Sequence, residues 1–321
     1  MIGISYIGDY LVQGSQIDKC KKSTDLEIKN TEFTIKDNRK DTSFDKITSY
    51  YSDNIYIHFN AINNNQSNLK TTKEIILSLL KYNIKMITID ASTLSYDTFE
   101  WSTIGEQQNY IKNMAKALAS LVSNNTILAI ENPDLDKNEK IFGSTIKNLS
   151  DLLVYTKKIL VEEYDFPKDK VNDYVGISLN LGNLVKSNDI VNINEWFKIF
   201  YNDIKCIKVR NLVNNLSLLD NILNIVLENS LNIPILLELD NELEEIKSEY
   251  NKFEFLINKK MKNEVISFEG YKGIKKKNNN DIIYDDFNLV KENGFTNIVV
   301  ILIIVFTVIT ALLMLMVELK H

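Results

Sequence analysis

The sequence predicts an α/β protein that is built as a (β/α)8 barrel and followed by a linker and one transmembrane helix. Three observations support this prediction. Short apolar runs that end in a polar residue recur along residues 1–262, segments with helical character separate these runs, and a long uncharged run lies near the end of the chain. Strands that alternate with helices are typical of parallel strands joined by crossover helices.

The expected elements follow one another in a regular order. A first strand is expected at Met1–Tyr6, and a second, less legible one near Leu26–Ile28 or Phe33–Ile35. Six further strands end in a polar residue: Ile55–His58, Met86–Asp90, Ile127–Glu131, Val175–Asn180, Ile204–Lys208 and Ile235–Glu238. The expected helices are Thr72–Tyr82, Ile104–Ser123, Ser144–Tyr164, Ile193–Tyr201, Leu216–Ser230 and Glu242–Lys260. Eight strands are therefore expected, and each of the last six is followed by an expected helix.

The spacing of these units favours a barrel over an open sheet. Successive polar strand ends lie 28 to 49 residues apart, and eight such units fit within residues 1–262, the size of a (β/α)8 barrel. A doubly wound sheet would more often carry a glycine-rich turn after its first strand, and Gly3–Gly8 lacks that pattern.

The parity of each strand predicts which side chains point into the barrel. Because successive side chains alternate between faces, an inward Glu131 implies an inward Ala129, while Leu128 and Ile130 face the helices. The same rule gathers six polar strand ends at the carboxyl end of the barrel, which we call the mouth: His58, Asp90, Glu131, Asn180, Lys208 and Glu238. A deeper layer would hold Tyr56, Thr88, Ser178, Cys206 and Leu236. Barrel enzymes carry their chemistry in the mouth.

Composition and motifs exclude several classes of function. The chain of 321 residues has a net charge of -6 and an isoelectric point near 5.2, which argues against nucleic acid as a partner. The two cysteines, Cys20 and Cys206, lie far apart and lack zinc spacing, so neither a disulfide framework nor a structural metal is expected. The sequence contains no GxSxG elbow, Walker loop or HExxH motif.

The last part of the chain predicts a membrane anchor. Residues 298–317 carry no charge, and twenty helical residues span about 30 Å, the thickness of the hydrocarbon core. We therefore expect a barrel at 1–262, a charged linker at 263–296, a transmembrane helix at 297–317 and a short tail at 318–321. Met1–Asp9 does not resemble a signal peptide. The expected arrangement is a single-pass membrane protein whose barrel lies on the cytoplasmic side, with the lipid bilayer as a partner of residues 298–317.

Several strand ends resemble those of the xylose isomerase-like TIM barrels, a family of sugar isomerases, sugar-phosphate epimerases and endonuclease IV. The resemblance rests on Leu128–Asn132, Val175–Asn183, Ile204–Asn211 and Leu236–Glu238, with Ile57, His58 and Asn60 similar to an earlier strand of the endonuclease branch. The order and spacing of these segments carry the resemblance, which covers residues 1–262. It implies a TIM barrel with a metal site in its mouth.

The chain keeps only part of the metal pattern that the resemblance implies. Glu131 and Glu238 match the two metal-binding acids of the family. Asn180 stands where the family has an aspartate, and Asn183 and Lys208 stand where it has histidines. Because these replacements remove negative charge and add a fixed cation, no cofactor is expected, and metal catalysis is expected to be lost.

The residues in the mouth allow more than one interpretation. Lys208 could take the place of the metal between Glu131 and Glu238, or the three could form an ion-pair network that only fills the top of the barrel. His58 matches a ligand of the endonuclease branch, but a buried histidine is more often a hydrogen-bonded core residue. Asp90 stands where that branch has a histidine.

The leading hypothesis is a binding or scaffold protein for a small sugar or sugar phosphate. The alternative is an isomerase or epimerase in which Glu131 and Glu238 exchange protons with a carbon next to a carbonyl and Lys208 stabilises the enolate oxygen. Endonuclease activity is the third, disfavoured hypothesis. Catalytic roles are thus expected for Glu131, Glu238 and Lys208, and the expected ligand contacts are His58, Asp90, Asn132, Asn180, Asn183 and Asn211.

Overall fold

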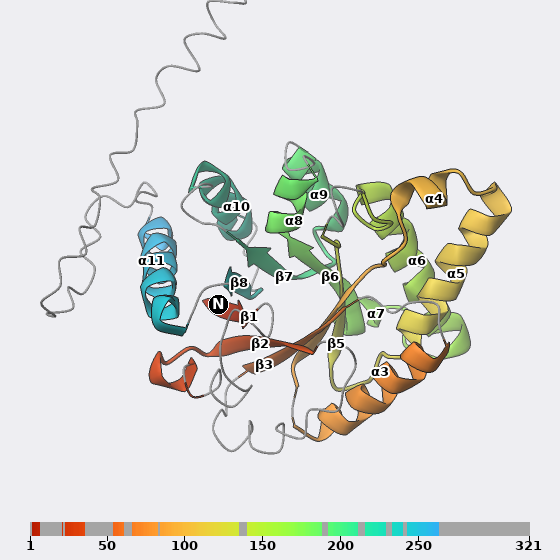
Figure 1. Cartoon of the computed structure of the whole chain (residues 1–321), viewed down its shortest axis with the longest axis horizontal. Coiled ribbons are helices and arrows are strands. Elements are labelled where there is room, and N and C mark those ends of the chain that lie inside the picture. The colour runs from red at the N-terminus through yellow and green to blue at the C-terminus, as the bar shows by residue number, and fades with distance from the viewer. Residues whose placement is uncertain are drawn as a thin grey trace, which may run out of the picture. The chain divides into compact units, whose positions relative to one another are not determined.

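The structure is a computed structural model that describes residues 2–6, 21, 23–35, 54–60, 66–82, 84–134, 140–187, 192–210, 216–228, 233–239 and 243–262. The chain divides into two compact units, Met1–Gly273 and Ile274–His321, and all described residues belong to the first. In that unit, helices surround a central set of strands (Figure 1).

Eight parallel strands close into a barrel in the order of the sequence. They are β1 (Ile2–Tyr6), β2 (Asn30–Ile35), β3 (Asn54–Phe59), β4 (Met86–Asp90), β5 (Ile127–Glu131), β6 (Val175–Asn180), β7 (Ile204–Val209) and β8 (Ile235–Leu239). Pairing of β1 with β8, in which Ser5 lies opposite Glu238, completes the closure. The predicted eight-stranded barrel is thereby confirmed.

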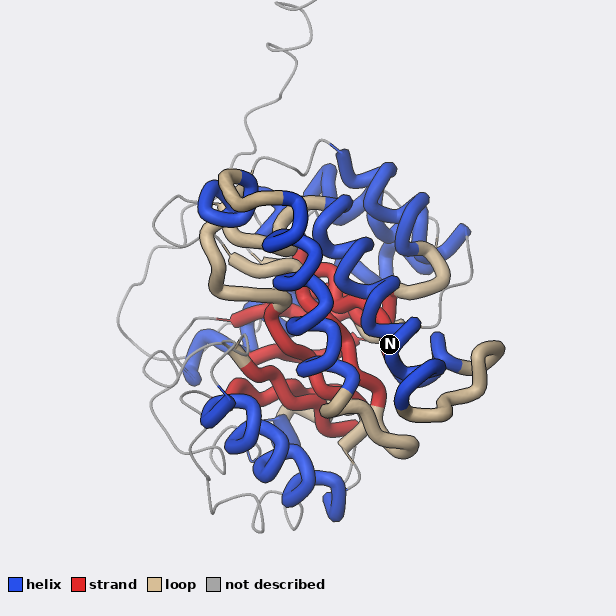
Figure 2. The backbone as a smooth tube through the Cα atoms, turned by 90° about the vertical axis from the view of Figure 1, so that its right-hand side faces the viewer, coloured by secondary structure: helices blue, strands red, loops and turns tan. Residues whose placement is uncertain are grey.

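The helices pack around this barrel, as the tube in Figure 2 shows from a second direction. They are α3 (Gln66–Leu79), the 3-10 turn η1 (Leu80–Tyr82), α4 (Tyr96–Glu100), α5 (Ile104–Ala119), α6 (Ile146–Glu163), α7 (Val171–Tyr174), α8 (Leu181–Lys186), α9 (Ile193–Phe200), α10 (Leu216–Glu228) and α11 (Leu243–Met261). The six long helices match the predicted ones within a few residues at each end, except that α3 begins six residues before Thr72. The sequence analysis missed α4, α7 and α8, which are too short to show a helical period.

Local sequence explains where helices begin. Thr103 accepts a hydrogen bond from the backbone of Glu106, whose carboxylate accepts one from the backbone of Thr103, and this capping box starts α5. Thr145 caps α6, and Asn180 caps α8 at the mouth. The side chain of Asn180 therefore has a structural task as well as a place in the mouth.

The sequence analysis gave two alternative positions for the second strand. Of the two predicted alternatives, Phe33–Ile35 lies inside β2, whereas Leu26–Ile28 precedes it. The first half of β2 contains Asn30 and Glu32, which interrupt the apolar pattern that identifies other strands. Both side chains are nevertheless buried.

Burial separates the two faces of the barrel wall as parity predicts. One buried cluster consists of inward residues: Tyr56, Met86, Ala129, Cys206 and Leu236. A second, larger cluster joins the outward residues of the strands, such as Leu128 and Ile130, to the helices. The apolar interior layer lies below the polar side chains of the mouth and supports them.

No helix in the described part of the chain is long and apolar enough to cross a membrane. The predicted linker at 263–296, transmembrane helix at 297–317 and tail at 318–321 lie outside the described residues. They therefore stay predictions of the sequence.

Candidate functional site

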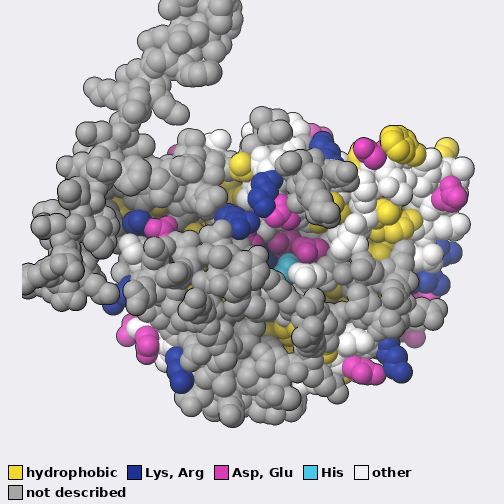
Figure 3. All heavy atoms as spheres, viewed as in Figure 1, with side chains coloured by type: hydrophobic (Ala, Val, Ile, Leu, Met, Phe, Trp, Pro, Cys, Tyr) yellow, Lys and Arg dark blue, Asp and Glu magenta, His cyan; other side chains and the backbone are white. Residues whose placement is uncertain are grey.

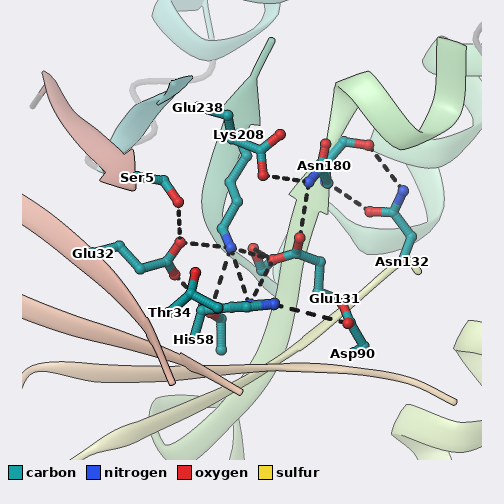
Figure 4. Close-up of polar contacts among 12 residues, drawn as sticks. Ser5, Glu32, Thr34, His58, Asp90, Glu131, Asn132, Asn180, Lys208 and Glu238 are labelled. Atoms are coloured by element: carbon teal, nitrogen blue, oxygen red, sulfur yellow. Dashed lines mark hydrogen bonds and ion pairs between the residues drawn. The ribbon is translucent and has the colours of Figure 1, made fainter. Parts of the chain in front are cut away.

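Lys208, near the end of β7, lies at the centre of the mouth with only 1% of its side chain exposed. Its Nζ lies 2.7 Å from Glu32 Oε2 and 2.5 Å from Glu131 Oε2, so one ammonium joins two carboxylates (Figure 4). A third contact, of 3.4 Å, reaches the hydroxyl of Thr88. Burial lowers the pKa of Lys208, but the charges of Glu131 and Glu32 raise it well above its usual value. The ammonium is therefore charged at neutral pH.

Glu32 is the site residue that the sequence analysis missed. It is fully buried in β2 and accepts hydrogen bonds from Ser5, at 2.5 Å, and from Thr88, at 2.6 Å. Burial raises the pKa of this carboxyl, but the Lys208 ammonium and the hydrogen bonds outweigh burial and leave the pKa below its usual value. Glu32 lies in the middle of β2, whereas the sequence analysis considered the polar residues that end each strand.

One interpretation of the sequence placed Lys208 between Glu131 and Glu238, but its Nζ forms ion pairs with Glu131 and Glu32. The amide of Asn180 joins Glu131 and Glu238 instead, because its Nδ2 donates to Glu131 Oε1 and to Glu238 Oε1, each at 2.8 Å. The other contacts of the ammonium, each 3.4 Å long, are with Thr88 Oγ1 and His58 Nδ1.

Among the described residues, Glu238 has fewer hydrogen-bond partners than Glu32 or Glu131. Within the described part of the chain it accepts one hydrogen bond, from Asn180. Burial, the largest cause, and the negative charge of Glu131 raise its pKa to about 7, although Lys208 and Arg210 oppose this shift. Glu238 can therefore gain or lose a proton near neutral pH.

His58 and Asp90 form the more exposed side of the mouth. Their side chains are 12% and 23% exposed, and His58 Nε2 lies 3.8 Å from Asp90 Oδ2. Burial and the charge of Lys208 lower the pKa of His58, whereas burial and the charge of Glu131 raise the pKa of Asp90 well above its usual value. Figure 3 shows acidic side chains around a histidine in a hollow of this face, with basic side chains nearby.

The asparagines predicted to contact a ligand hold the strand ends together. Asn132 Nδ2 donates to the carbonyl of Asn180 at 2.9 Å, and Asn132 Oδ1 accepts from the backbone N–H of Asn180 at 2.7 Å. Asn183 Nδ2 donates to the carbonyl of Asn132 at 2.8 Å. These bonds fix the carboxyl ends of β5 and β6. Asn211 lies outside the described residues, and ligand contact by these asparagines stays a prediction.

The polar groups of the mouth thus form two levels. The lower level, which we call the floor, consists of side chains whose hydrogen bonds to one another are extensive: Ser5, Glu32, Thr88, Glu131, Ser178, Asn180 and Lys208. His58, Asp90 and Glu238 retain capacity for a further partner above the floor. The geometry therefore combines a rigid ionic floor with a small number of groups that can contact a ligand.

One group of described residues has the spacing of a metal site. His58, Asp90 and Glu131 each offer a ligand atom, and these atoms lie within 4.8 Å of one another. Oε2 of Glu131, however, already contacts the Lys208 ammonium at 2.5 Å and accepts from Ser178 at 2.9 Å. A dication bound there would face a buried positive charge, so the donor set does not fit a divalent ion.

Comparison with solved structures identifies the fold. A 3-keto-D-glucoside 4-epimerase from E. coli matches with a TM-score of 0.55 and 10% identity, over 80% of this chain and 98% of that one. A probable 3-DHS dehydratase from Bacillus anthracis, involved in petrobactin synthesis, matches with a TM-score of 0.56 and 12% identity, over 78% and 98% of the two chains. The chain has a xylose isomerase-like TIM-barrel fold.

A third structure has the same fold by its own description. It is a xylose isomerase-like TIM-barrel protein from Mycobacterium smegmatis in complex with magnesium, with a TM-score of 0.53 and 12% identity, over 79% of this chain and 95% of that one. No protein-family model matches the sequence, and no curated protein matches it. At these identities the xylose isomerase-like likeness establishes the fold, and the chemistry has to be argued from the mouth itself.

Proposed function

We propose that this xylose isomerase-like barrel is a binding protein for a small sugar-like molecule and that it works without a divalent metal. The observation that carries the proposal is the Lys208 ammonium, which lies buried between Glu32 and Glu131. The ammonium supplies the positive charge that holds the acids of the mouth in place. Within the described residues it contacts Glu32, Glu131, Thr88 and His58, so its role is to organise the site.

The groups above the floor suit a ligand with several hydroxyl groups. His58, Asp90 and Glu238 lie around the opening and can each form a further hydrogen bond. Two structures of similar fold are a 3-keto-D-glucoside 4-epimerase and an L-ribulose 3-epimerase. These names support a sugar-like ligand by analogy of fold, while the polar groups of the mouth support it by their chemistry.

The proposal includes attachment to a membrane. Residues 298–317 contain twenty consecutive residues without a charge, which is the length that a helix needs to cross the hydrocarbon core. We propose that this segment anchors the chain in a lipid bilayer with the barrel on the cytoplasmic side. Ligand binding would then take place close to the membrane.

A second function is favoured by Glu238, whose pKa of about 7 is suited to proton transfer at neutral pH. In an isomerase reaction, Glu238 would take a proton from a carbon next to a carbonyl and return it to the former carbonyl carbon. An epimerase reaction would also need a second acid, such as Glu131, to protonate the opposite face of the same carbon. Glu131 already contacts Lys208, Ser178 and Asn180, so fewer of its oxygen lone pairs are open to a ligand than those of Glu238.

A thermal-shift experiment on the purified full-length chain tests the main proposal. Aldoses, ketoses and their phosphates are added singly, and Mg²⁺, Mn²⁺ and Zn²⁺ are added in a separate series. A ligand at 100 times its Kd adds about 2.7 kcal/mol of stability, which is readily seen as a rise in melting temperature. We expect a rise with at least one sugar and none with the metals. Purification of the chain with a stoichiometric metal ion would overturn the metal-free site.

A hydrogen-exchange experiment tests the second function, that of an isomerase or epimerase. Incubation of each stabilising sugar in D2O, followed by NMR, detects exchange of a hydrogen bound to carbon. Exchange that is lost in Glu238→Gln would establish proton transfer. Binding without exchange would leave the chain a binding protein.

A further inference from the structure

The hydroxyl of Thr88 determines the state of the neighbouring imidazole. A hydroxyl has one hydrogen to donate and two lone pairs that accept. Thr88 Oγ1 lies 2.6 Å from Oε1 of Glu32, a carboxylate without a hydrogen, so Thr88 donates to Glu32. Its two lone pairs are then available to Lys208 Nζ at 3.4 Å and to His58 Nδ1 at 3.0 Å.

This arrangement requires the hydrogen of His58 to be on Nδ1. If Nδ1 were unprotonated, two lone pairs would face each other across the 3.0 Å contact with Thr88. Lys208 Nζ lies 3.4 Å from the same nitrogen, but each hydrogen of the ammonium already has a closer or equally close oxygen partner. In the neutral ring, Nε2 is therefore a pure acceptor.

The accepting nitrogen has no direct hydrogen bond to Asp90. The distance of 3.8 Å between His58 Nε2 and Asp90 Oδ2 is beyond hydrogen-bonding length. These two side chains are also 12% and 23% exposed, against 1% for Lys208. Figure 4 shows the two side chains pointing toward each other, with a dashed line between them.

We propose that Nε2 of His58 and the carboxyl of Asp90 together bind a hydroxyl group of the ligand, and that Thr88 and Glu32 hold the imidazole in the accepting tautomer. The site thereby selects a hydroxyl group over a phosphate oxygen. Only the ligand part of this inference rests on the proposed function. The tautomer is a property of the free protein.

Hydrogen-bond polarity explains the preference for a hydroxyl over a phosphate. A phosphate offers only lone pairs, and so does Nε2 of His58, whereas a hydroxyl supplies the hydrogen that Nε2 can accept. Asp90 Oδ2 lies 3.8 Å from the same nitrogen, so one hydroxyl group can lie between the two side chains and contact both.

The tautomer can be measured by 15N NMR of the full-length chain labelled only at histidine. The chain has two histidines, His58 and His321, and the variant His58→Gln assigns the signal of His58 by its disappearance. We expect a protonated Nδ1 and an unprotonated Nε2 in the wild-type protein without ligand. Observation of the opposite tautomer, or of a doubly protonated ring at neutral pH, would overturn the proposal.

Two substitutions of Thr88 test whether its hydroxyl sets the tautomer of His58. Thr88→Ser keeps the hydroxyl and should keep the tautomer, whereas Thr88→Val removes the acceptor and should shift the hydrogen of His58 towards Nε2. Thr156→Val is the matched control, because Thr156 is a buried threonine of α6 whose hydroxyl bonds to Leu152. An unchanged tautomer in a folded Thr88→Val protein would refute the role of Thr88. The wild-type spectrum decides the tautomer even if this variant does not fold.

A matched pair of ligands tests the hydroxyl site. D-fructose and inorganic phosphate are titrated against the labelled chain, and we expect the sugar, not the phosphate, to shift the Nε2 signal of His58. A sugar that stabilises the protein without moving this signal would overturn the site. If no sugar stabilises the chain, the sugar-binding function fails, and glycerol at molar concentration becomes the probe. An unchanged Nε2 signal in glycerol would then overturn the hydroxyl site as well.

Discussion

Replacement of Lys208 by methionine removes the charge at the centre of the floor while keeping most of the side-chain volume. The ammonium contacts Glu32 and Glu131 directly and is 1% exposed, so the variant leaves two carboxylates without their counter-ion in the barrel. Loss of one partner of a buried ion pair costs about 3–5 kcal/mol of folding free energy. We expect a loss of this size for Lys208→Met at neutral pH.

The assay is urea unfolding together with thermal melting. For a domain of this size, each kcal/mol lowers the melting temperature by about 2–4 °C, so the expected fall is roughly 6–20 °C. The loss should be smaller at acidic pH, because without the ammonium burial raises the pKa of Glu32, and protonation of this carboxyl removes its uncompensated charge. The double variant Glu32→Gln with Lys208→Met should lose less stability than the two single variants add up to, since the residues are in contact.

The control is Lys116→Met, which removes an ion pair on the surface. Lys116 lies 3.1 Å from Glu163, and both side chains are 46% exposed, so this pair should contribute between zero and about 1 kcal/mol. If Lys208→Met costs no more than Lys116→Met, the ammonium does not hold the floor together. The proposed substitution of a lysine for a metal ion would then lose its physical basis.

Three further predictions follow from the other charged groups and from the tail. The pKa of Glu238 is raised to about 7 from 4.5, so the folded state retains a proton that the unfolded state loses, and stability falls as pH rises through this window. Urea unfolding should therefore show Glu238→Gln to be more stable than wild type by on the order of 3 kcal/mol at about pH 8 and by little at about pH 4. An equal effect at both pH values would contradict the raised pKa. The triple variant Asn180→Asp, Asn183→His and Lys208→His should show a rise in melting temperature with zinc or manganese that wild type lacks, and a rise in wild type would show that the ammonium does not exclude metal. The full-length chain should remain in the membrane pellet after washing with concentrated salt while residues 1–290 remain in the supernatant; release of the full-length chain by salt alone would exclude a transmembrane anchor.

The fold could be predicted because two periodicities are strong in this sequence. Strands such as Val175–Asn180 alternate inward polar or small residues with outward aliphatic ones, and long helices separate them at regular intervals. The same parity predicted the six side chains that converge in the mouth. Each element signals its own identity locally, so no tertiary contact was needed to find it.

The charge pairing within the mouth could not be predicted in the same way. Parity places Lys208 inside the barrel, but it does not tell which acids the long, flexible side chain will reach. Glu32 sits in β2 next to Asn30 and Thr31, in a strand too polar to be recognised from an apolar run. Its position became clear only from the pairing of β2 with β1, which brings Glu32 beside Ser5.

The position of Lys208 in the floor also accounts for the raised pKa of Glu238. A divalent ion could neutralise two carboxylates at once, whereas the single charge of Lys208 is used against Glu32 and Glu131. Among the described residues, Glu238 accepts a hydrogen bond only from the neutral amide of Asn180, and its pKa rises to about 7 as a consequence of burial near other acids. A lysine at the centre of the floor therefore leaves one carboxyl that changes its charge near neutral pH. The charge of Glu238 acts on Asp90 in the proposed hydroxyl site, so ligand binding and protonation of Glu238 should be coupled.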